Sequence, residues 1–215
     1  MITTLRSELK DIPLRMLNLP IDERGYPVPW FVEWIDGKPE FRAASAAKWL
    51  QAVKEKRCWV CGQRLGAYLC FVLGPMCGVT RTTSEPPCHR DCARWSARFC
   101  PFLARPHMIR RGTEQLEAMG AEAAGGILIQ RNPGVTLLWY ARDFKVWHPD
   151  DGGVLITVGD PTEWEWWAEG RKATRAEVDE SIRTGLPNLE EIAHQQEGGM
   201  EDLQRQIADF QKYLP

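Results

Sequence analysis

Two pairs of cysteine and histidine residues carry the clearest chemical signal in this chain. Cys58 and Cys61 are separated by two residues, and His89 and Cys92 repeat that spacing further along the sequence. Zinc takes four Cys or His ligands at the corners of a tetrahedron, and one short turn with this spacing can supply two corners. The four residues therefore predict a structural metal site, with Zn²⁺ as the cofactor.

The second pair has an alternative in which Cys88 replaces His89. We prefer His89, because residues three apart in the first turn of a helix share a face and the two-residue spacing then repeats. A redox Cys-x-x-Cys motif is less favoured, since that motif follows a strand whereas Cys58 follows an amphipathic helical pattern. Buried cysteines that bind no metal are the remaining interpretation.

Other motifs give little support for an enzyme. His89-Arg90-Asp91 spells the start of a kinase catalytic loop, but Ser96 stands where that loop needs asparagine. An enzyme would need an open metal position or a clustered acid–base pair. His107 and His148, each beside charged residues, are the weak candidates, and a lone histidine of this kind is more often a surface residue. No catalytic residue is predicted, and a zinc-supported hydrolase or nuclease is the alternative function.

The composition is that of a globular protein. The chain has 215 residues, of which 44% are hydrophobic and 26% charged, so it can form one or two domains. Seven cysteines, an odd number, without a signal peptide favour a reducing cytoplasm over a disulfide framework. No run approaches the ~20 apolar residues of a membrane span, so no membrane partner is expected.

Basic residues gather in the middle of the chain, and acidic residues dominate its C-terminal part. Arg90, Arg94 and Arg98 recur every fourth residue and so form one stripe on a helix. Joined by Arg110 and Arg111, this stripe could follow a phosphate backbone, which makes nucleic acid a candidate partner. An equally weighted interpretation is that the arginines are solvated or pair with the acidic part of the chain.

The predicted elements around the metal ligands follow a recognisable order. A helix over 44–56 leads into the first pair, and a strand over 67–73 turns at Gly74-Pro75 into a short return over 76–80. Ser84 is the expected N-cap of the next helix, with Pro86 and Pro87 in its first turn. This order of helix, knuckle, β-hairpin and helix resembles the treble-clef zinc fold.

The rest of the chain predicts a hairpin before this module and a sheet with helices after it. Asp36-Gly37 is the tight turn between strands over 29–35 and 39–42. Further strands, separated by turn signals, favour an antiparallel meander; they cover 127–130, 135–141, 144–147, 154–158 and 163–167. A short helix is expected at 114–123. A capping box at Thr174 begins a helix closed by Gly185, Asn188 caps a second, and 200–213 forms a third.

Several segments together resemble an uncharacterised group of zinc-knuckle hypothetical proteins of phages and bacteria. The segments that carry this resemblance are Arg24 to Phe31, Gly74 to Cys77, Ser84 to Pro87, Cys100 to Leu103 and Ala168 to Arg171. The resemblance implies no assigned activity. It implies a mobile-element setting, in which small proteins that bind host machinery are common.

We therefore expect an α+β protein. Residues 1–125 would hold the N-terminal hairpin, helix and treble-clef-like zinc module, and residues 126–215 an antiparallel sheet with flanking helices; no linker separates the two parts, so they can share a core. The expected function is that of a non-enzymatic, zinc-stabilised binding protein that contacts nucleic acid or a host protein through the arginine-rich helix. A structural or assembly component is a further alternative, and no oligomeric state is predicted.

Overall fold

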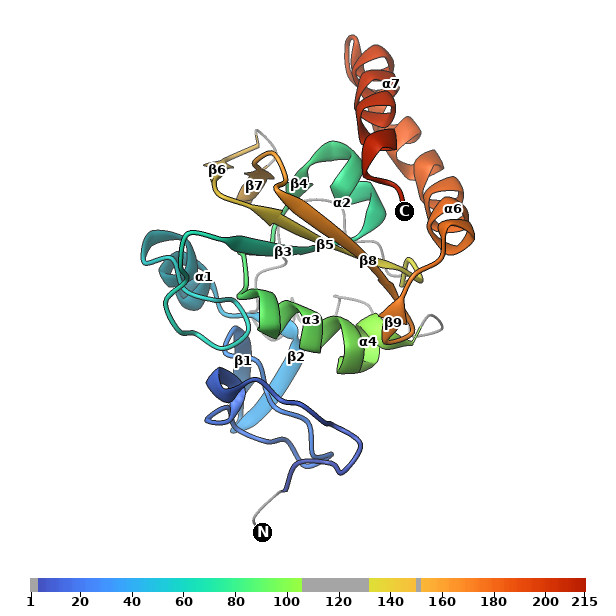
Figure 1. Ribbon diagram of the computed structural model, residues 1–215. Helices are drawn as coiled ribbons and strands as arrows, with labels where there is room; N and C mark the ends of the chain where they lie inside the picture. Colours follow the sequence, from blue (N-terminus) through green and yellow to red (C-terminus); the bar gives the residue numbers. More distant parts are fainter. Residues whose placement is uncertain (1–3, 106–131, 150–151) are drawn as a thin grey trace.

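The computed structural model describes residues 4–105, 132–149 and 152–215 and shows a mixed α+β protein with antiparallel sheets (Figure 1). Its elements in chain order are η1 (Leu14–Met16), β1 (Val32–Ile35), β2 (Lys38–Ala44), α1 (Ala46–Lys54), β3 (Leu69–Leu73), α2 (Pro75–Thr80), β4 (Thr82–Thr83), α3 (Arg90–Phe99), α4 (Pro101–Ala104), β5 (Thr136–Ala141), β6 (Phe144–Trp147), β7 (Leu155–Val158), β8 (Glu163–Ala168), β9 (Arg171–Lys172), α6 (Arg175–Ala193), α7 (Gly199–Phe210) and η2 (Gln211–Tyr213).

The central sheet has the strand order β3-β5-β8-β9. Every residue of β5 is buried, so this strand lies inside the sheet, with β3 pairing on one side and β8 on the other. Because β3 precedes residue 125 and β5 follows it, the two parts of the chain contribute neighbouring strands to one sheet. Sheets of this kind need cover on both faces when both faces are apolar.

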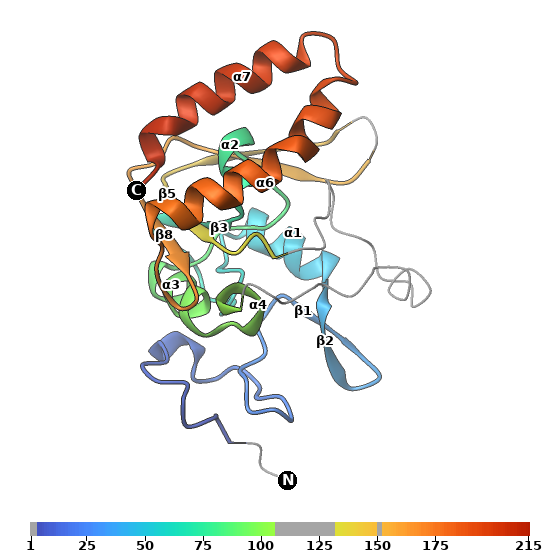
Figure 2. The same cartoon turned by 90° about the vertical axis from the view of Figure 1, so that its right-hand side faces the viewer.

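Helices pack on both faces of the central sheet, and both views show this layering (Figures 1 and 2). Phe71, Leu137 and Trp166 belong to a core that includes residues of α2, α6 and α7. The alternate strand residues Cys70 and Tyr140 belong to a second core, which includes residues of α3 and the N-terminal segment. The alternation of strand side chains thus divides the interior into two cores.

The expected meander is wrong in its strand order. The β6–β7 hairpin pairs with β4 in a separate three-stranded sheet, and β5 pairs directly with β8. The physical reason is burial. Strand β6 is largely exposed and can lie at the edge of a sheet, whereas β5 is fully buried and needs a neighbouring strand on each side. The strand and helix expected at 127–130 and 114–123 lie outside the described residues.

Three helix boundaries also differ from the expectation. The return over 76–80 is helix α2, which begins at Pro75, a residue favoured in the first turn. Helix α3 begins at Arg90 rather than near Ser84, because Cys88 pairs with Cys70 through two backbone hydrogen bonds of 2.7 and 3.0 Å. Helix α6 continues through Gly185 and Asn188, where packing against α2 outweighs weak local propensity.

Other local predictions are confirmed. Asp36 and Gly37 both have positive φ between β1 and β2, as a two-residue hairpin turn requires. Thr174 and Glu177 form the capping box that begins α6. The final helix packs with its apolar residues Leu203 and Phe210 buried in the core beside Trp166.

Candidate metal centre

Cys58, Cys61, His89 and Cys92 lie together, with their four ligand atoms all within 4.8 Å of one another. The first two residues belong to the loop after α1, His89 is the N-cap of α3, and Cys92 lies in the first turn of that helix. The three cysteines are buried and His89 is half-buried. These residues can hold a metal ion.

One spacing between candidate ligand atoms can be compared with that of a tetrahedral zinc ion. Zinc bonds of about 2.3 Å to sulfur and 2.0 Å to nitrogen place neighbouring ligand atoms roughly 3.5–3.8 Å apart. Cys61 Sγ lies 3.4 Å from His89 Nδ1, close to that edge length. Three sulfurs and one imidazole nitrogen are also the donor types that zinc takes in structural sites.

A tight backbone turn presents the first pair of cysteines. The Gly62 N–H donates to the Cys58 carbonyl at 2.8 Å, and the Cys58 N–H donates to the Gln63 carbonyl at 2.8 Å. Gly62 has φ +72°, and a Cβ there would lie 2.6 Å from the Trp30 ring. Glycine is therefore required at this position both for the left-handed backbone and for the close approach of the indole.

A backbone carbonyl orients the histidine ring. His89 Nε2 lies 3.0 Å from the Arg64 carbonyl oxygen, so Nε2–H donates there and the lone pair of Nδ1 is left to face the sulfur of Cys61. A second hydrogen bond of this kind fixes the tautomer and the ring plane of metal-binding histidines. Sequence reasoning missed Arg64, because its contribution comes from the main chain and leaves no side-chain signal.

Backbone and thiol donors surround the sulfur of Cys58. The N–H groups of His89 and Cys61 point at Cys58 Sγ from 3.3 and 3.5 Å. Burial raises the pKa of this thiol, but hydrogen bonds from Cys61, Cys88 and Cys92 outweigh burial and lower the pKa overall. These donors therefore favour the thiolate form of Cys58, which is the form that binds metals.

Cys88, the alternative ligand, lies outside the four-residue group. Its pKa is raised by its hydrogen bond to Cys58 and by its own burial, so its thiol stays protonated. Burial also raises the pKa of Cys70, which pairs with Cys88 along the backbone. Both are neutral core thiols beside the cluster, and all seven cysteines are free of disulfides.

Each arginine of the predicted stripe that the structure describes contacts a carboxylate of this chain. Arg90 pairs with Glu163, and its guanidinium lies 4.3 Å from the centroid of the Tyr140 ring. Arg94 donates from Nε to Glu165 at 2.7 Å. Arg98 lies 3.5 Å from Asp11, while Arg110 and Arg111 lie outside the described residues.

Glu165 is the buried member of these ion pairs, although glutamate is seldom buried. Its carboxylate accepts hydrogen bonds from Tyr140 Oη at 2.7 Å and Trp167 Nε1 at 3.0 Å, and it also pairs with Arg94 and Lys172. Burial alone would raise the pKa of Glu165, but these donors lower it to about 2. The carboxylate therefore fastens α3 to β8.

Of the two catalytic candidates, the structure describes only His148, which lies in no cluster of metal-ligating residues among the described ranges. His148 is exposed, and its Nδ1 lies 3.2 Å from the Gly153 carbonyl oxygen. Within the described ranges, the cysteine–histidine group is the only cluster that could hold a metal, and His148 is not in it. His107 lies outside the described residues. No helix in the described part of the chain is long and apolar enough to cross a membrane.

Comparisons with known proteins give no match. No family model matches the chain, and neither a curated protein nor a solved structure is similar to it. The functional argument therefore depends on the residues and their geometry.

Proposed function

We propose that this chain is a non-enzymatic binding protein, stabilised by one zinc ion in a treble-clef-like module. The observation that carries the proposal is the group of Cys58, Cys61, His89 and Cys92, whose ligand atoms all lie within 4.8 Å of one another. Four protein donors complete a tetrahedron, whereas catalytic zinc sites keep one position open for water or substrate. The donor set therefore favours a structural ion.

The position of the site agrees with a scaffold role. An ion bound by these residues would join the loop after α1 to the beginning of α3, and α3 in turn packs on β3, β5 and β8. Structural zinc contributes its binding free energy to folding, because the unfolded chain has no preformed site. The metal would thus hold the loop after α1 on the central sheet through α3.

The contacts of the stripe arginines favour a protein over a nucleic acid as the partner. The guanidinium groups of Arg90, Arg94 and Arg98 already contact carboxylates, and phosphate would have to displace Glu163, Glu165 and Asp11. A phosphate backbone is bound by cations that exchange small counterions, not by cations committed to internal carboxylates. We therefore assign these arginines to the docking of α3.

Metal content tests the scaffold directly. Elemental analysis of protein purified without chelator should give one zinc per chain, and Cys92→Ser should lose it. Cys88→Ser is the matched control and should keep the zinc, because Cys88 is equally buried but outside the ligand group. Metal-free wild type, or loss of zinc in Cys88→Ser with retention in His89→Ala, would overturn the assignment.

X-ray absorption at the zinc edge separates the scaffold from the hydrolase alternative. The proposal expects three sulfur neighbours at about 2.3 Å and one nitrogen near 2.0 Å. An additional oxygen neighbour in place of one protein ligand would indicate an open position and would favour metal-assisted hydrolysis.

A salt titration tests the arginine assignment. At low salt, short duplex DNA and RNA should bind the triple variant Arg90→Ala, Arg94→Ala, Arg98→Ala at least as well as they bind wild type. A wild-type affinity that falls steeply with salt and a slope reduced by roughly one contact per arginine removed would instead show a nucleic-acid surface.

A further inference from the structure

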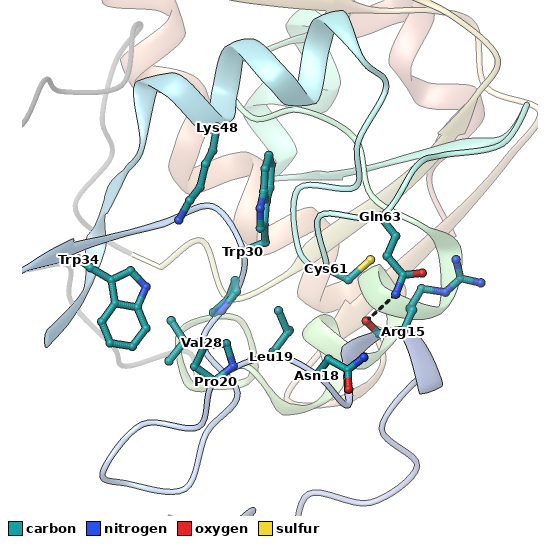
Figure 3. A pocket seen from close by; sticks show the side chains of 11 residues that line it. Arg15, Asn18, Leu19, Pro20, Val28, Trp30, Trp34, Lys48, Cys61 and Gln63 are labelled. Carbon is teal, nitrogen blue, oxygen red and sulfur yellow. Dashed lines mark hydrogen bonds between the residues drawn. The ribbon is translucent and has the colours of Figure 1, made fainter. Parts of the chain in front are cut away.

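A small groove lies beside the candidate metal centre (Figure 3). It has a volume of about 250 Å³ and is bounded by the segment after η1, the chain leading into β1, helix α1 and the loop that carries Cys58 and Cys61, which we call the knuckle loop. Its walls are mainly apolar and aromatic, and they include Leu19, Pro20, Val28, Trp30 and Trp34. Pockets that enclose whole drug-sized ligands begin at about 300 Å³, so this groove suits one or two side chains of a larger partner.

Two indoles offer both apolar surface and hydrogen-bond donors in this groove. Trp34 is 41% exposed on β1, and Trp30 is half-buried against the knuckle. Neither indole N–H has a hydrogen-bond partner among the described residues, and no described buried side-chain nitrogen or oxygen is unpaired. The Trp30 indole N–H is therefore accessible to a ligand, and the Trp34 side chain that carries the other is itself exposed. Exposed tryptophans of this kind are typical of binding surfaces, because one side chain provides both apolar area and a hydrogen-bond donor.

The groove also has a positive character. Arg15 and Lys48 contribute to its lining, and no aspartate or glutamate does. The Arg15 guanidinium is committed to Asp91 at 2.9 Å. Figure 3 shows Lys48 extending from α1 with Trp34 and Trp30 to either side, and its ammonium donates to the Val32 carbonyl at 3.0 Å, without an ion pair among the described residues. A bound carboxylate would supply that missing partner.

These features select one kind of ligand. A polyproline II segment makes no internal backbone hydrogen bonds, so its carbonyls remain available to indole N–H donors while its proline rings pack on the indole faces. A carboxylate next to the prolines would pair with Lys48. We propose that this groove binds an extended, proline-containing segment of a partner protein that carries an acidic residue beside the prolines.

This inference rests on the proposed function, because the knuckle forms one wall of the groove. The backbone N–H of Trp30 donates to the Val60 carbonyl at 2.7 Å, and the Trp30 ring lies directly over Gly62. Gln63 Nε2 donates to the Arg15 carbonyl at 3.3 Å, which ties the opposite wall to the same loop. Removal of zinc should therefore disorganise both walls and weaken peptide binding.

The test uses fluorescence anisotropy with a pool of labelled decapeptides. Each peptide carries a Pro-x-x-Pro core and one flanking glutamate, and a matched pool carries glutamine in its place. The zinc-loaded full chain should bind members of the glutamate pool. Trp34→Ala should weaken binding by about 10-fold or more, the usual effect of truncating an interface anchor. Lys48→Gln should weaken the glutamate peptides and leave the glutamine peptides unchanged.

Trp147→Ala is the matched control, since Trp147 is also 41% exposed but lies on edge strand β6 of another sheet. It should bind like wild type. Absence of binding to either pool, or equal loss in Trp34→Ala and Trp147→Ala, would overturn the inference. Binding of oligothymidylate that Trp34→Ala abolishes, without peptide binding, would assign the groove to single-stranded nucleic acid instead. The zinc content of every sample is measured to separate the two proposals. If zinc-loaded protein does not bind the peptides, only the peptide-binding inference is wrong. If wild type contains no zinc, the proposed zinc scaffold is wrong.

Discussion

Glu163 and Glu165 lie two positions apart on β8, but only Glu165 is buried. Both side chains face α3, but the Glu165 side chain is 6% exposed and that of Glu163 is 44% exposed. A buried carboxylate is tolerated only where hydrogen bonds and opposite charges replace water, and Glu165 has four such donors. The neighbouring pair between Arg90 and Glu163 remains in contact with solvent.

Glu165→Gln should therefore destabilise the protein more than Glu163→Gln. Loss of the buried charge removes charge-assisted hydrogen bonds, and Arg94 and Lys172 can then be hydrated because they are partly exposed. We expect a decrease of about 2 kcal/mol in the free energy of unfolding for Glu165→Gln and less than about 1 kcal/mol for Glu163→Gln. Urea unfolding at pH 7 with zinc present measures both; equal effects would contradict the burial argument.

The same carboxylate gives a pH dependence with a definite sign. Its pKa falls from 4.5 to about 2 on folding, so its contribution is complete above the unfolded pKa and is lost as the pH falls from about 4.5 through 2. The difference in thermal midpoint between wild type and Glu165→Gln should thus shrink in acid. Acid release of zinc affects both proteins alike and cancels in the difference. A difference that grows below pH 4.5 would show that the carboxylate is not stabilised in the fold.

Residue types and spacing were sufficient to predict that Cys58, Cys61, His89 and Cys92 come together in a group that can hold a metal ion, because zinc coordination needs particular side chains at short range. The same approach could not predict the pairing of the arginines. The spacing of Arg90, Arg94 and Arg98 shows that they share a helix face, but the carboxylates of Glu163 and Glu165 are brought there only by the packing of α3 on β8. The groove was missed for a related reason, since exposure of Trp34 depends on chain segments distant in sequence.

At the scale of elements, the errors arose where long-range contacts override local signals. Gly74-Pro75 suggested a turn, but Pro75 begins helix α2, which packs between the central sheet and helices α6 and α7. Strand β5 was placed correctly along the sequence, yet its partners follow from burial of both its faces. Local motifs such as the capping box at Thr174 were predicted well, because the residues that form their hydrogen bonds lie within one helical turn of each other.

Gly78 in α2 gives an element-scale prediction in which packing opposes helix propensity. Alanine is the better helix former by roughly 1 kcal/mol, so propensity alone predicts that Gly78→Ala stabilises the protein. A Cβ at Gly78, however, would lie 2.8 Å from Leu137 Cδ2 and 2.9 Å from the Phe210 ring. Overpacking of this kind costs about 1–3 kcal/mol, and we expect net destabilisation.

Gly66→Ala is the control for that substitution, because no atom lies within 4 Å of a Cβ at Gly66. Its effect should be neutral or slightly stabilising. Urea unfolding of the two variants measures the contrast. Stabilisation by Gly78→Ala would mean that α2 does not pack against β5 and α7 as closely as the structure shows.

At the scale of the whole molecule, one sheet separates two cores that depend on different parts of the chain. The three cysteines of the candidate metal centre, α3 and the N-terminal segment contribute to one core, while α2, α6 and α7 contribute to the other. Strand β3, which precedes residue 125 in the sequence, pairs directly with β5, which follows it. The candidate metal ligands and the C-terminal helices therefore belong to cores on opposite faces of the same strands.

This arrangement predicts that fragments 1–125 and 126–215 do not fold separately. The first would leave β3 without β5, and the second would leave the fully buried β5 exposed along one edge and on the face that α3 covers. Neither fragment should show a cooperative thermal transition by circular dichroism. When mixed with zinc, the fragments should recover the transition, since the pairing of β3 with β5 and the packing of α3 need no covalent link. Cooperative unfolding of the isolated 126–215 fragment would instead show a self-sufficient C-terminal domain, in which β5 tolerates the loss of its neighbour.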